Sequence, residues 1–549
     1  MINTYFINPS TCDTAFKELC TYTPKPFYSI TRHAADINSD SDSPAILLVH
    51  HQEPPSSSLL GSDMGKEPKN DEMSTTENVY PGELQASAPF DNMGVKGDCT
   101  RQQEMSPDST LKIKSKKRVS FPLGEQIVSG SAEPWYPWTT VACVTVEEVI
   151  SSYKLSCKNL GVHPLHKLLT QLEEITDIQQ RIKCLDLKGE NLDNVSCEAL
   201  EEIFKRIRFK MISLEWAKLN EDGASALFDM MEYYDSTLCL RISFSRNIGR
   251  RGWMAAAQLI QKSNSLQEFE ASGIPLMDNT ASCLARGLRA NHHLRVLRLD
   301  NARLSGRSLM QLVCALKMNQ VLQELYLADN NLSSDQDSMH LRDLLQVNCT
   351  IQLLDLKNNC IFNTGLEDIC EGLKGQKQGL KKLILWNNKL THKGMTHLAA
   401  ILPNLTSLET LNLGRNPLSN EGIHRLKEGL IANRSVTRLG LASTAITCEG
   451  AVAMAEFIVE STGILRLDLR RNSIRTGGLM ALTLAMKLNN SLVQLDLDKG
   501  PMGEKEGWLI ETQKLLLIKI AKCCKGNLMM KRAKQEEKKH EENSTGRPL

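Results

Sequence analysis

The chain has 549 residues and a formal net charge of +1, with 41% hydrophobic and 23% charged residues. A net charge this close to zero excludes a bulk field that would attract nucleic acid or a membrane surface, so we expect neither as a partner. The 16 cysteines form no CxxC pair, so we expect no bound metal or other cofactor. No apolar run approaches the ~20 residues that span a bilayer, and the scattered cysteines suit a reducing compartment, so we expect a cytoplasmic or additionally nuclear location.

Residues 1–140 are expected to form a disordered arm. They are rich in Ser, Asp, Pro and Glu, as in Asp36–Pro44 and Pro54–Glu67. A segment of this composition cannot bury enough apolar surface to offset the entropy cost of ordering it. A short motif in such an arm is accessible to a partner.

The end of the arm carries a basic cluster followed by Val-x-Phe. Val119 and Phe121 are two positions apart, so in an extended peptide both side chains point the same way and can fill two adjacent apolar pockets. The backbone can add to an exposed sheet edge, while Lys116, Lys117 and Arg118 would meet an acidic surface. This pattern matches the short docking motif for the catalytic subunit of protein phosphatase 1.

Two other interpretations of this cluster stay open: a solvated basic patch, or a weak nuclear import signal in Lys116–Arg118. Ser120 follows basic residues, as a basophilic kinase requires. Phosphorylation there would add about −1.5 to −2 charges between the two apolar anchors. We expect it to weaken docking, if Ser120 is modified at all.

The same pattern occurs twice more, at Arg206–Phe209 and Arg241–Phe244. Both copies fall inside predicted repeats, where Phe209 and Phe244 are expected to occupy core positions of the strands. A partner could not reach them there without unfolding the repeats. The copy at 118–121 is therefore the candidate docking site.

Residues 141–181 are predicted to form a helical N-terminal cap. Thr145–Ile150 has acidic residues in what would be a first helical turn, and His163–Ile175 is the second predicted helix. The Trp135–Trp138 stretch precedes the cap. It either staples the arm onto the cap or extends the phosphatase contact.

The middle of the chain, residues 182–503, repeats the pattern Leu-x-x-Leu-x-Leu-x-x-Asn-x-Leu about twelve times. The repeats begin at 182, 209, 239, 266, 294, 322, 351, 380, 408, 436, 464 and 492, at intervals of 27 to 30 residues. This spacing predicts an α/β leucine-rich-repeat solenoid of the ribonuclease-inhibitor-like class. Because strands stack ~4.8 Å apart and helices ~8–10 Å apart, the stack should curve into a horseshoe with a strand-lined concave face.

Two sets of positions follow from this template. The Asn position is expected to be structural, since a buried amide satisfies backbone groups at the turn; Asn is found there at Asn247, Asn330, Asn359, Asn388, Asn416 and Asn472. Tyr326, Ile384 and Trp386 fall on concave-face strand positions and are a candidate patch for a second partner protein. The alternative is that Trp386 packs on neighbouring strand side chains.

The C-terminal part is predicted to close the solenoid and then become a solvated tail. Residues 504–525 should form a cap helix over the last repeat, because the ends of a solenoid need covering. Residues 526–549 are a charged tail that mixes Lys with Glu.

Several stretches resemble one known family: Gln126–Gly130, Glu133–Trp138, Cys184–Glu190, Gly223–Met230, Glu324–Asn330 and Leu439–Thr444. With the docking motif, they make the chain resemble the protein phosphatase 1 regulatory subunit 37 family over roughly residues 112–530. The resemblance implies binding to the phosphatase catalytic subunit through Arg118, Val119, Ser120 and Phe121, and inhibition of its activity. Redirection toward chosen substrates stays open as the alternative outcome. Residues 1–110 do not resemble this family.

Enzyme motifs are absent from the sequence, including the P-loop, Gly-x-Gly-x-x-Gly, His-Glu-x-x-His and Gly-x-Ser-x-Gly, so we expect a binding protein rather than an enzyme. Two other functions of leucine-rich horseshoes stay open. Activation of a small GTPase would use loop arginines such as Arg303 or Arg471. Ribonuclease inhibition would use the concave face.

Overall fold

The computed structural model describes residues 145–376, 378–501 and 503–544. All of them belong to the second of two compact units, which comprises residues 119–549. The predicted arm at 1–140 lies outside the described residues, as does the last part of the predicted tail.

Two helices precede the first repeat, α2 (Val146–Leu160) and α3 (His166–Glu173). Thr145 and Glu148 form a capping box at the start of α2, which satisfies two backbone donors that a helix leaves free. Tyr153 is buried, and its hydroxyl accepts a hydrogen bond from the Leu165 backbone at 3.0 Å. This bond joins the two helices. The helix α2 also packs against α4 and α5 of the first repeat.

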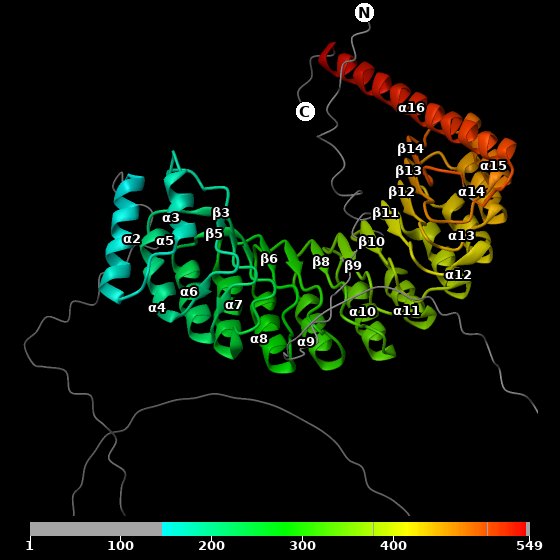
Figure 1. Cartoon of the computed structure of the whole chain (residues 1–549). Helices are drawn as coiled ribbons and strands as arrows, with labels where there is room; N and C mark the ends of the chain where they lie inside the picture. The colour runs from blue at the N-terminus through cyan, green and yellow to red at the C-terminus, as the bar shows by residue number, and fades with distance from the viewer. Residues whose placement is uncertain (1–144, 377, 502, 545–549) are drawn as a thin grey trace, which may run out of the picture. The chain divides into compact units, whose positions relative to one another are not determined.

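Twelve parallel strands form one sheet whose order is the order of the chain (Figure 1). They are β1 (Leu185–Asp186), β3 (Phe209–Ser213), β5 (Thr237–Arg241), β6 (Glu268–Glu270), β7 (Val296–Arg298), β8 (Glu324–Tyr326), β9 (Leu353–Asp355), β10 (Lys382–Ile384), β11 (Thr410–Asn412), β12 (Arg438–Gly440), β13 (Arg466–Asp468) and β14 (Gln494–Asp496). A smaller parallel pair joins β2 (Asn191–Leu192) to β4 (Lys218–Leu219). Each repeat therefore adds one strand beside the last, and the predicted α/β solenoid is confirmed.

Helices connect successive strands and pack on one another along the outer side of the stack (Figure 1). They are α4 (Asn194–Ala199), α5 (Glu201–Phe204), α6 (Glu221–Tyr233), α7 (Gly249–Lys262), α8 (Asp278–Arg289), α9 (Gly306–Leu316), α10 (Asp335–Val347), α11 (Asn363–Leu373), α12 (His392–Ile401) with the 3₁₀ turn η2 (Leu402–Asn404), α13 (Ser419–Ala432), α14 (Cys448–Glu460) and α15 (Thr476–Leu488). Strands are narrower than helices, so this unit curves with its strands on the inner side.

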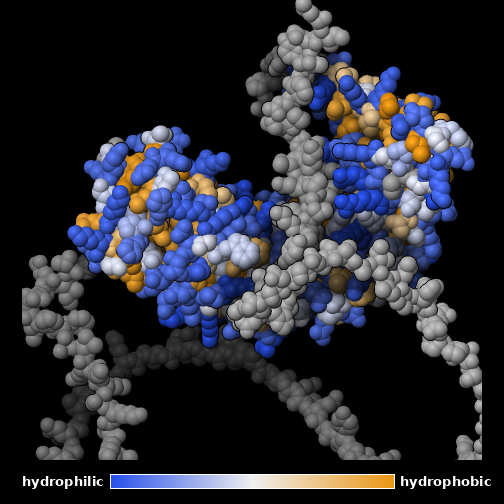
Figure 2. Space-filling model, in the orientation of Figure 1, coloured by the Kyte–Doolittle hydropathy of each residue, from blue (hydrophilic) through white to orange (hydrophobic). Residues whose placement is uncertain are grey.

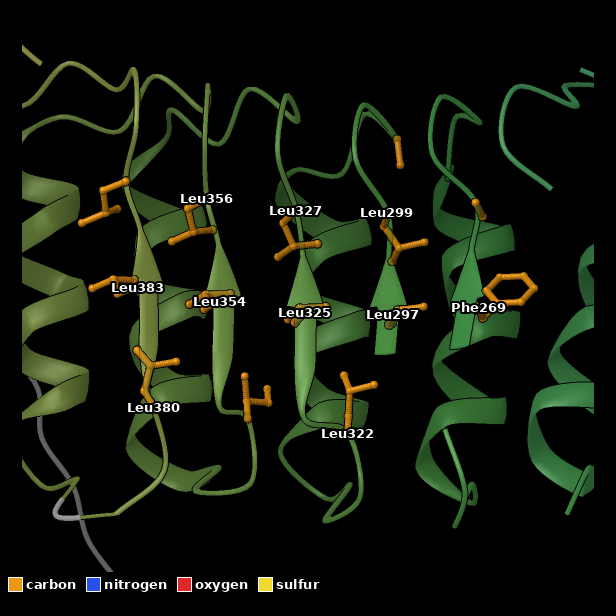
Figure 3. Close-up of a cluster of buried hydrophobic side chains, with 14 of the residues drawn as sticks. Phe269, Leu297, Leu299, Leu322, Leu325, Leu327, Leu354, Leu356, Leu380 and Leu383 are labelled. Atoms are coloured by element: carbon orange, nitrogen blue, oxygen red, sulfur yellow. The ribbon is translucent and has the colours of Figure 1, made fainter. Parts of the chain in front are cut away.

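The core lies between the sheet and the helices. Each strand points two apolar side chains toward the helices, as Leu325 and Leu327 do in β8 and just after it (Figure 3). Both are fully buried, and their equivalents in the neighbouring repeats lie directly beside them. Burial of one leucine contributes roughly 1.5–3 kcal/mol, so the pair contributes roughly 3–6 kcal/mol of apolar stabilisation to each repeat.

A ladder of buried amides confirms the structural interpretation of the repeated Asn. The Asn330 Oδ1 accepts from the Ala302 and Leu304 backbone amides at 2.8 and 3.1 Å, and its Nδ2 donates to the Leu299 carbonyl at 2.8 Å. The same arrangement recurs in later repeats, at Asn359, Asn388, Asn416 and Asn472. Each amide satisfies backbone groups of the preceding repeat.

The third repeat departs from the predicted register. Phe209 pairs with Thr237, so this repeat begins at residue 237 rather than 239. The amide position falls on Ser245, which is buried and whose hydroxyl donates to the Leu214 carbonyl at 2.8 Å. Asn247 is exposed, and its assignment to the ladder is wrong. The inward pair Leu240 and Ile242 sets the register, because shifting it would expose both.

A second amide ladder, which the sequence analysis missed, lies where each helix ends and the next strand begins. The Asn319 Nδ2 donates to the Leu288 carbonyl at 2.8 Å, and its Oδ1 accepts from the Leu322 amide at 2.8 Å. Its other members are Asn291, Asn348, Gln376, Asn433 and Asn489. The sequence does contain a matching pattern, Asn three residues before the first apolar residue of a repeat.

One helix, α16 (Gly507–Ser544), covers the open end of the last repeat. Leu516, Ile520 and Cys524 are buried on one face of it. The face continues to Asn527, whose Nδ2 donates to the Asn489 and Leu492 carbonyls at 2.9 and 3.0 Å. The cap therefore extends past residue 525, where the sequence pattern ended it, because α16 itself supplies the next rung of the second ladder.

Candidate partner-binding surfaces

The predicted docking residues Lys116, Lys117, Arg118, Val119, Ser120 and Phe121 lie outside the described residues. The structure does describe the two other copies of the pattern. In the copy at 206–209, Ile207 and Phe209 are both buried in the core. That copy is closed to a partner, as expected.

The copy at 241–244 differs from the expectation. Phe244 is not a core residue of a strand: it follows the strand with φ +66° and is half-buried. Its ring stacks on that of Trp216, with the ring centroids 4.3 Å apart and the planes 12° from parallel. The shift in register moves Phe244 from the strand into the turn. The copy still cannot dock, because Ile242 is 0% exposed.

Polar side chains form a connected network on the inner surface of β5 to β8. Arg241 lies 3.3 Å from Glu270, and Arg298 lies 3.3 Å from Glu268. The guanidinium carbon of Arg298 is 3.7 Å from the centroid of the Tyr326 ring. The Tyr326 hydroxyl donates to Glu324 at 2.8 Å and is only half-buried. Tyr326 is therefore held in one orientation, with part of its ring open to a partner.

Two carboxyl groups on the inner surface are shielded from water. Burial, together with the neighbouring charge of Asp355, raises the pKa of Asp300 to about 7. Burial likewise raises the pKa of Asp355 to about 6. Asp300 accepts from the Ala328 amide at 2.7 Å, and Asp355 accepts from the Lys357 amide at 2.9 Å. Both groups therefore hold loop backbone and gain a proton near neutral pH.

Trp386 and Ile384 follow one another on the inner side of β10 and just beyond it. Ile384 is 1% exposed, between its register neighbours Asp355 and Asn412, so its assignment to an exposed patch is wrong. Trp386 is half-buried and lies flat on Gly414, where an added Cβ would be 2.2 Å from its ring. Trp386 thus packs on the neighbouring repeat while remaining partly exposed.

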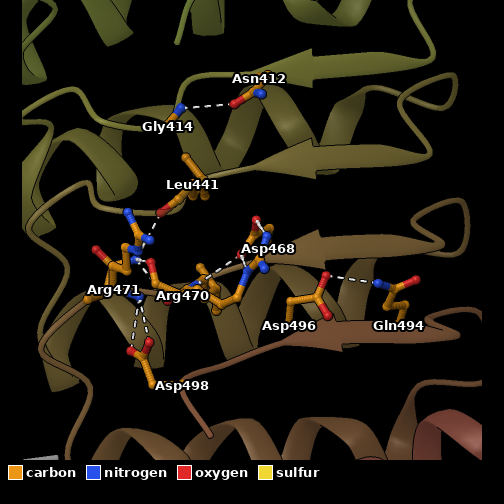
Figure 4. Close-up of polar contacts among 11 residues, drawn as sticks. Asn412, Gly414, Leu441, Asp468, Arg470, Arg471, Gln494, Asp496 and Asp498 are labelled. Carbon is orange, nitrogen blue, oxygen red and sulfur yellow. Dashed lines mark hydrogen bonds and ion pairs between the residues drawn. The ribbon is translucent and has the colours of Figure 1, made fainter. Parts of the chain in front are cut away.

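The inner surface near β12 to β14 is hydrophilic and ion-paired (Figures 2 and 4). The fully buried Asp468 accepts from the Arg470 guanidinium at 2.7 and 2.9 Å. The Arg471 backbone amide donates to both oxygens of Asp498 at 2.9 Å, while its side chain is exposed. Arg303 is exposed in the equivalent turn of an earlier repeat. Both candidate finger arginines are accessible and far apart along the solenoid.

Within the described ranges, no group of three or more His, Cys, Asp or Glu side chains is arranged to hold a metal ion. No helix there combines the length and the apolar character needed to cross a bilayer. The twelve cysteines of this part of the chain are free thiols.

A family model for the leucine-rich repeat matches residues 347–370 and 404–426. The twelve-stranded solenoid is built from leucine-rich repeats. "Protein phosphatase 1 regulatory subunit 37" of Homo sapiens is 56% identical over 305 residues, which are 55% of this chain and 44% of that protein. The Danio rerio protein of the same name is 56% identical over 293 residues, 53% of this chain and 32% of that protein.

A homolog under that name from Caenorhabditis elegans is 38% identical over 300 residues, covering 52% of this leucine-rich-repeat chain and 32% of that protein. The predicted resemblance is confirmed, although these alignments are shorter than the 112–530 range expected for it. The chain spans less than half the length of these relatives. A solved internalin from Listeria monocytogenes aligns with a TM-score of 0.38 and 14% identity, covering 70% of this chain and 97% of that one.

Proposed function

We propose that this chain is a regulatory subunit that binds the catalytic subunit of protein phosphatase 1 through Arg118–Phe121 and inhibits or redirects its activity. The observation that carries the proposal is the name shared by relatives 55–56% identical over about 300 residues. On this proposal the chain acts by binding and not by catalysis. It works in the cytoplasm or also in the nucleus, where its free thiols would persist.

The choice of docking site rests on exclusion among three copies of one pattern. Ile207 and Ile242, the first apolar residues of the other two copies, are fully buried. Val119 and Phe121 form the copy outside the repeats. Burying them on a partner would contribute roughly 1.5–3 kcal/mol each, and ordering the peptide costs about 2–5 kcal/mol. Strand hydrogen bonds would add about 1 kcal/mol each, so the motif alone binds weakly and a tight complex needs a second, tethered contact.

Two further features belong to the proposal. Phosphorylation of Ser120 would place negative charge between the anchors and weaken docking. A second protein would bind the inner surface of the repeats, with the part-exposed rings of Tyr326 and Trp386 as its anchors. Alanine at Trp386 should then reduce that binding without unfolding the chain.

The deciding experiment compares two double variants in the full chain. Val119→Ala with Phe121→Ala removes the proposed anchors. Leu111→Ala with Ile113→Ala removes two apolar side chains of the same spacing eight residues upstream and is the matched control. Binding of the purified phosphatase catalytic subunit should fall at least about 100-fold for the first pair, by roughly 3–6 kcal/mol of lost burial, and stay unchanged for the second.

Phosphatase activity of each mixture on two unrelated phosphoprotein substrates separates the two modes of regulation. Equal loss of activity on both substrates indicates inhibition, whereas loss on one alone indicates redirection. Undiminished capture of the phosphatase by the first double variant would refute docking at 118–121.

A further inference from the structure

We propose that the stacked pair Trp216 and Phe244 is a second contact surface for the phosphatase catalytic subunit docked at 118–121. This inference rests on the proposed function and adds to it a site on the repeats themselves. The pair lies on the turns that follow the second and third strands of the sheet, β3 and β5.

The backbone at this position is the same in almost every repeat. Four residues after the inward residue at the centre of each strand, the chain turns with positive φ, at Gly189, Trp216, Phe244, Gly273, Asn301, Asp329, Asn358, Asn387, Arg415, Ser443 and Arg471. Gly, Asn and Asp, which adopt this conformation most readily, fill six of these turns. A bulky aromatic residue there is unfavourable for the local backbone. Trp216 and Phe244 are therefore not explained by the turn they occupy.

Neighbouring repeats hold the pair rigidly. The Trp216 amide donates to the Ser243 carbonyl at 3.0 Å, and the Phe244 amide donates to the Ser272 carbonyl at 2.8 Å. Gly273, in the next turn, leaves room for the phenylalanine: an added Cβ would be 2.3 Å from the Phe244 ring. The three successive turns thus pack together and hold the two parallel rings in place.

The outer ring of this stack faces solvent. Trp216 is 61% exposed, whereas Phe244 beneath it is half-buried. Lys218 and Arg246, each two residues beyond a ring, are exposed, and Glu215 is ion-paired with Lys188 at 2.9 Å. A rigid, exposed tryptophan within a polar surround has the composition of an interface anchor, since Trp leads the residues that dominate binding energy.

The length of chain between the two sites argues for the phosphatase as the occupant. Phe121 lies 24 positions before Thr145, the first described residue, and α2, β3 and β5 lie at the same end of the stack (Figure 1). A linker of 24 residues reaches at most roughly 80 Å. As the unstructured segment that the sequence predicts, it would have a root-mean-square span of about 27 Å. A phosphatase held at 118–121 is thus tethered within reach of Trp216.

Tethering makes a weak contact effective. Short linkers give effective concentrations of about 1 mM, so a surface with a Kd of about 10–100 µM on its own would tighten the complex about 10–100-fold.

The test uses Trp216→Asn in the full chain. Three other repeats carry Asn at this turn, so the substitution suits the backbone. Ser443→Asn introduces the same residue at the equivalent turn near the other end of the sheet and is the matched control. We expect calorimetric titration with the phosphatase catalytic subunit to give an affinity at least 10-fold lower for Trp216→Asn and unchanged for Ser443→Asn. A peptide of residues 110–125 should match the weakened chain.

An affinity for Trp216→Asn within about twofold of wild type would overturn the inference. Adding Phe244→Asn, with a thermal melt to establish folding, excludes compensation by the second ring. If Val119→Ala with Phe121→Ala leaves binding intact, the proposed docking fails instead, so the two failures are distinguishable. If Trp216→Asn changes the mass measured by light scattering, a second copy of the chain occupies the rings. If it changes hydrogen exchange at 122–144 in the free chain, that segment occupies them. Either result refutes the inference.

Discussion

Asn359→Ala tests whether the amide ladder holds the repeats together. The side chain is 0% exposed, and its Nδ2 donates to the Leu327 carbonyl at 2.7 Å while its Oδ1 accepts from the Asn330 amide at 2.8 Å. Alanine leaves one buried acceptor and one buried donor without partners. Each unsatisfied group costs about 1–3 kcal/mol, so the free energy of unfolding should fall by roughly 2–6 kcal/mol.

Urea unfolding followed by circular dichroism measures this loss. Asn247→Ala is the control, because the sequence pattern places Asn247 in the same ladder but the structure exposes it. We expect the control to change the free energy of unfolding by less than about 0.5 kcal/mol. Hydrogen exchange should also accelerate at the Asn330 amide in Asn359→Ala alone. A loss below about 1 kcal/mol, or equal losses in both variants, would refute the reasoning.

Three further predictions concern pH, the cap and modification. Burial raises the pKa of Asp300 to about 7 and of Asp355 to about 6, above unfolded values near 3.9, so the folded state binds more protons and becomes more stable as pH falls from 7.5 to 5. The urea midpoint should therefore rise over this pH window in the wild type and rise less in Asp300→Asn. A wild-type midpoint that does not change with pH would contradict this prediction. Asn527→Ala should lower the melting temperature, because it leaves the Asn489 and Leu492 carbonyls without their hydrogen-bond donor. Ending the chain after residue 530 should leave the melting temperature unchanged. Equal melting temperatures for Asn527→Ala and wild type would count against the role of Asn527 in the cap. Ser120→Asp should weaken binding of the phosphatase catalytic subunit at least about 10-fold in calorimetry, and unchanged affinity would end the idea of control by phosphorylation.

The architecture could be predicted from the sequence because the pattern of each repeat lies within one short segment of the chain. Inward leucines such as Leu325 and Leu327 recur at a fixed spacing, and each repeat touches only its neighbours, so the period alone implies a parallel stack. The register of the third repeat failed because a chance Asn at 247 matched the pattern better than Ser245. The structure resolves this through the sheet pairing of Phe209 with Thr237, a contact that no single repeat contains.

The candidate surfaces were less predictable, since exposure depends on what the adjacent repeats supply. The prediction that Ile384 is exposed used only its position along one strand. Its side chain is buried because it lies between the strands on either side, next to Asp355 and Asn412. Trp386 rests on Gly414, and Phe244 rests beside Gly273, each a residue of the following repeat. Trp216 escaped notice because its conformation belongs to a turn and its stacking partner lies 28 residues away.

Both amide ladders have a direction. The side chain of each repeat serves the backbone of the repeat before it, from Asn330 on Leu299 to Asn527 on Leu492. Each repeat therefore depends on the repeat that follows it in the chain for these side-chain hydrogen bonds. A shortened form made by deleting central repeats should be joined so that α16 still follows its own last repeat, because Asn527 donates to the Asn489 and Leu492 carbonyls of that repeat.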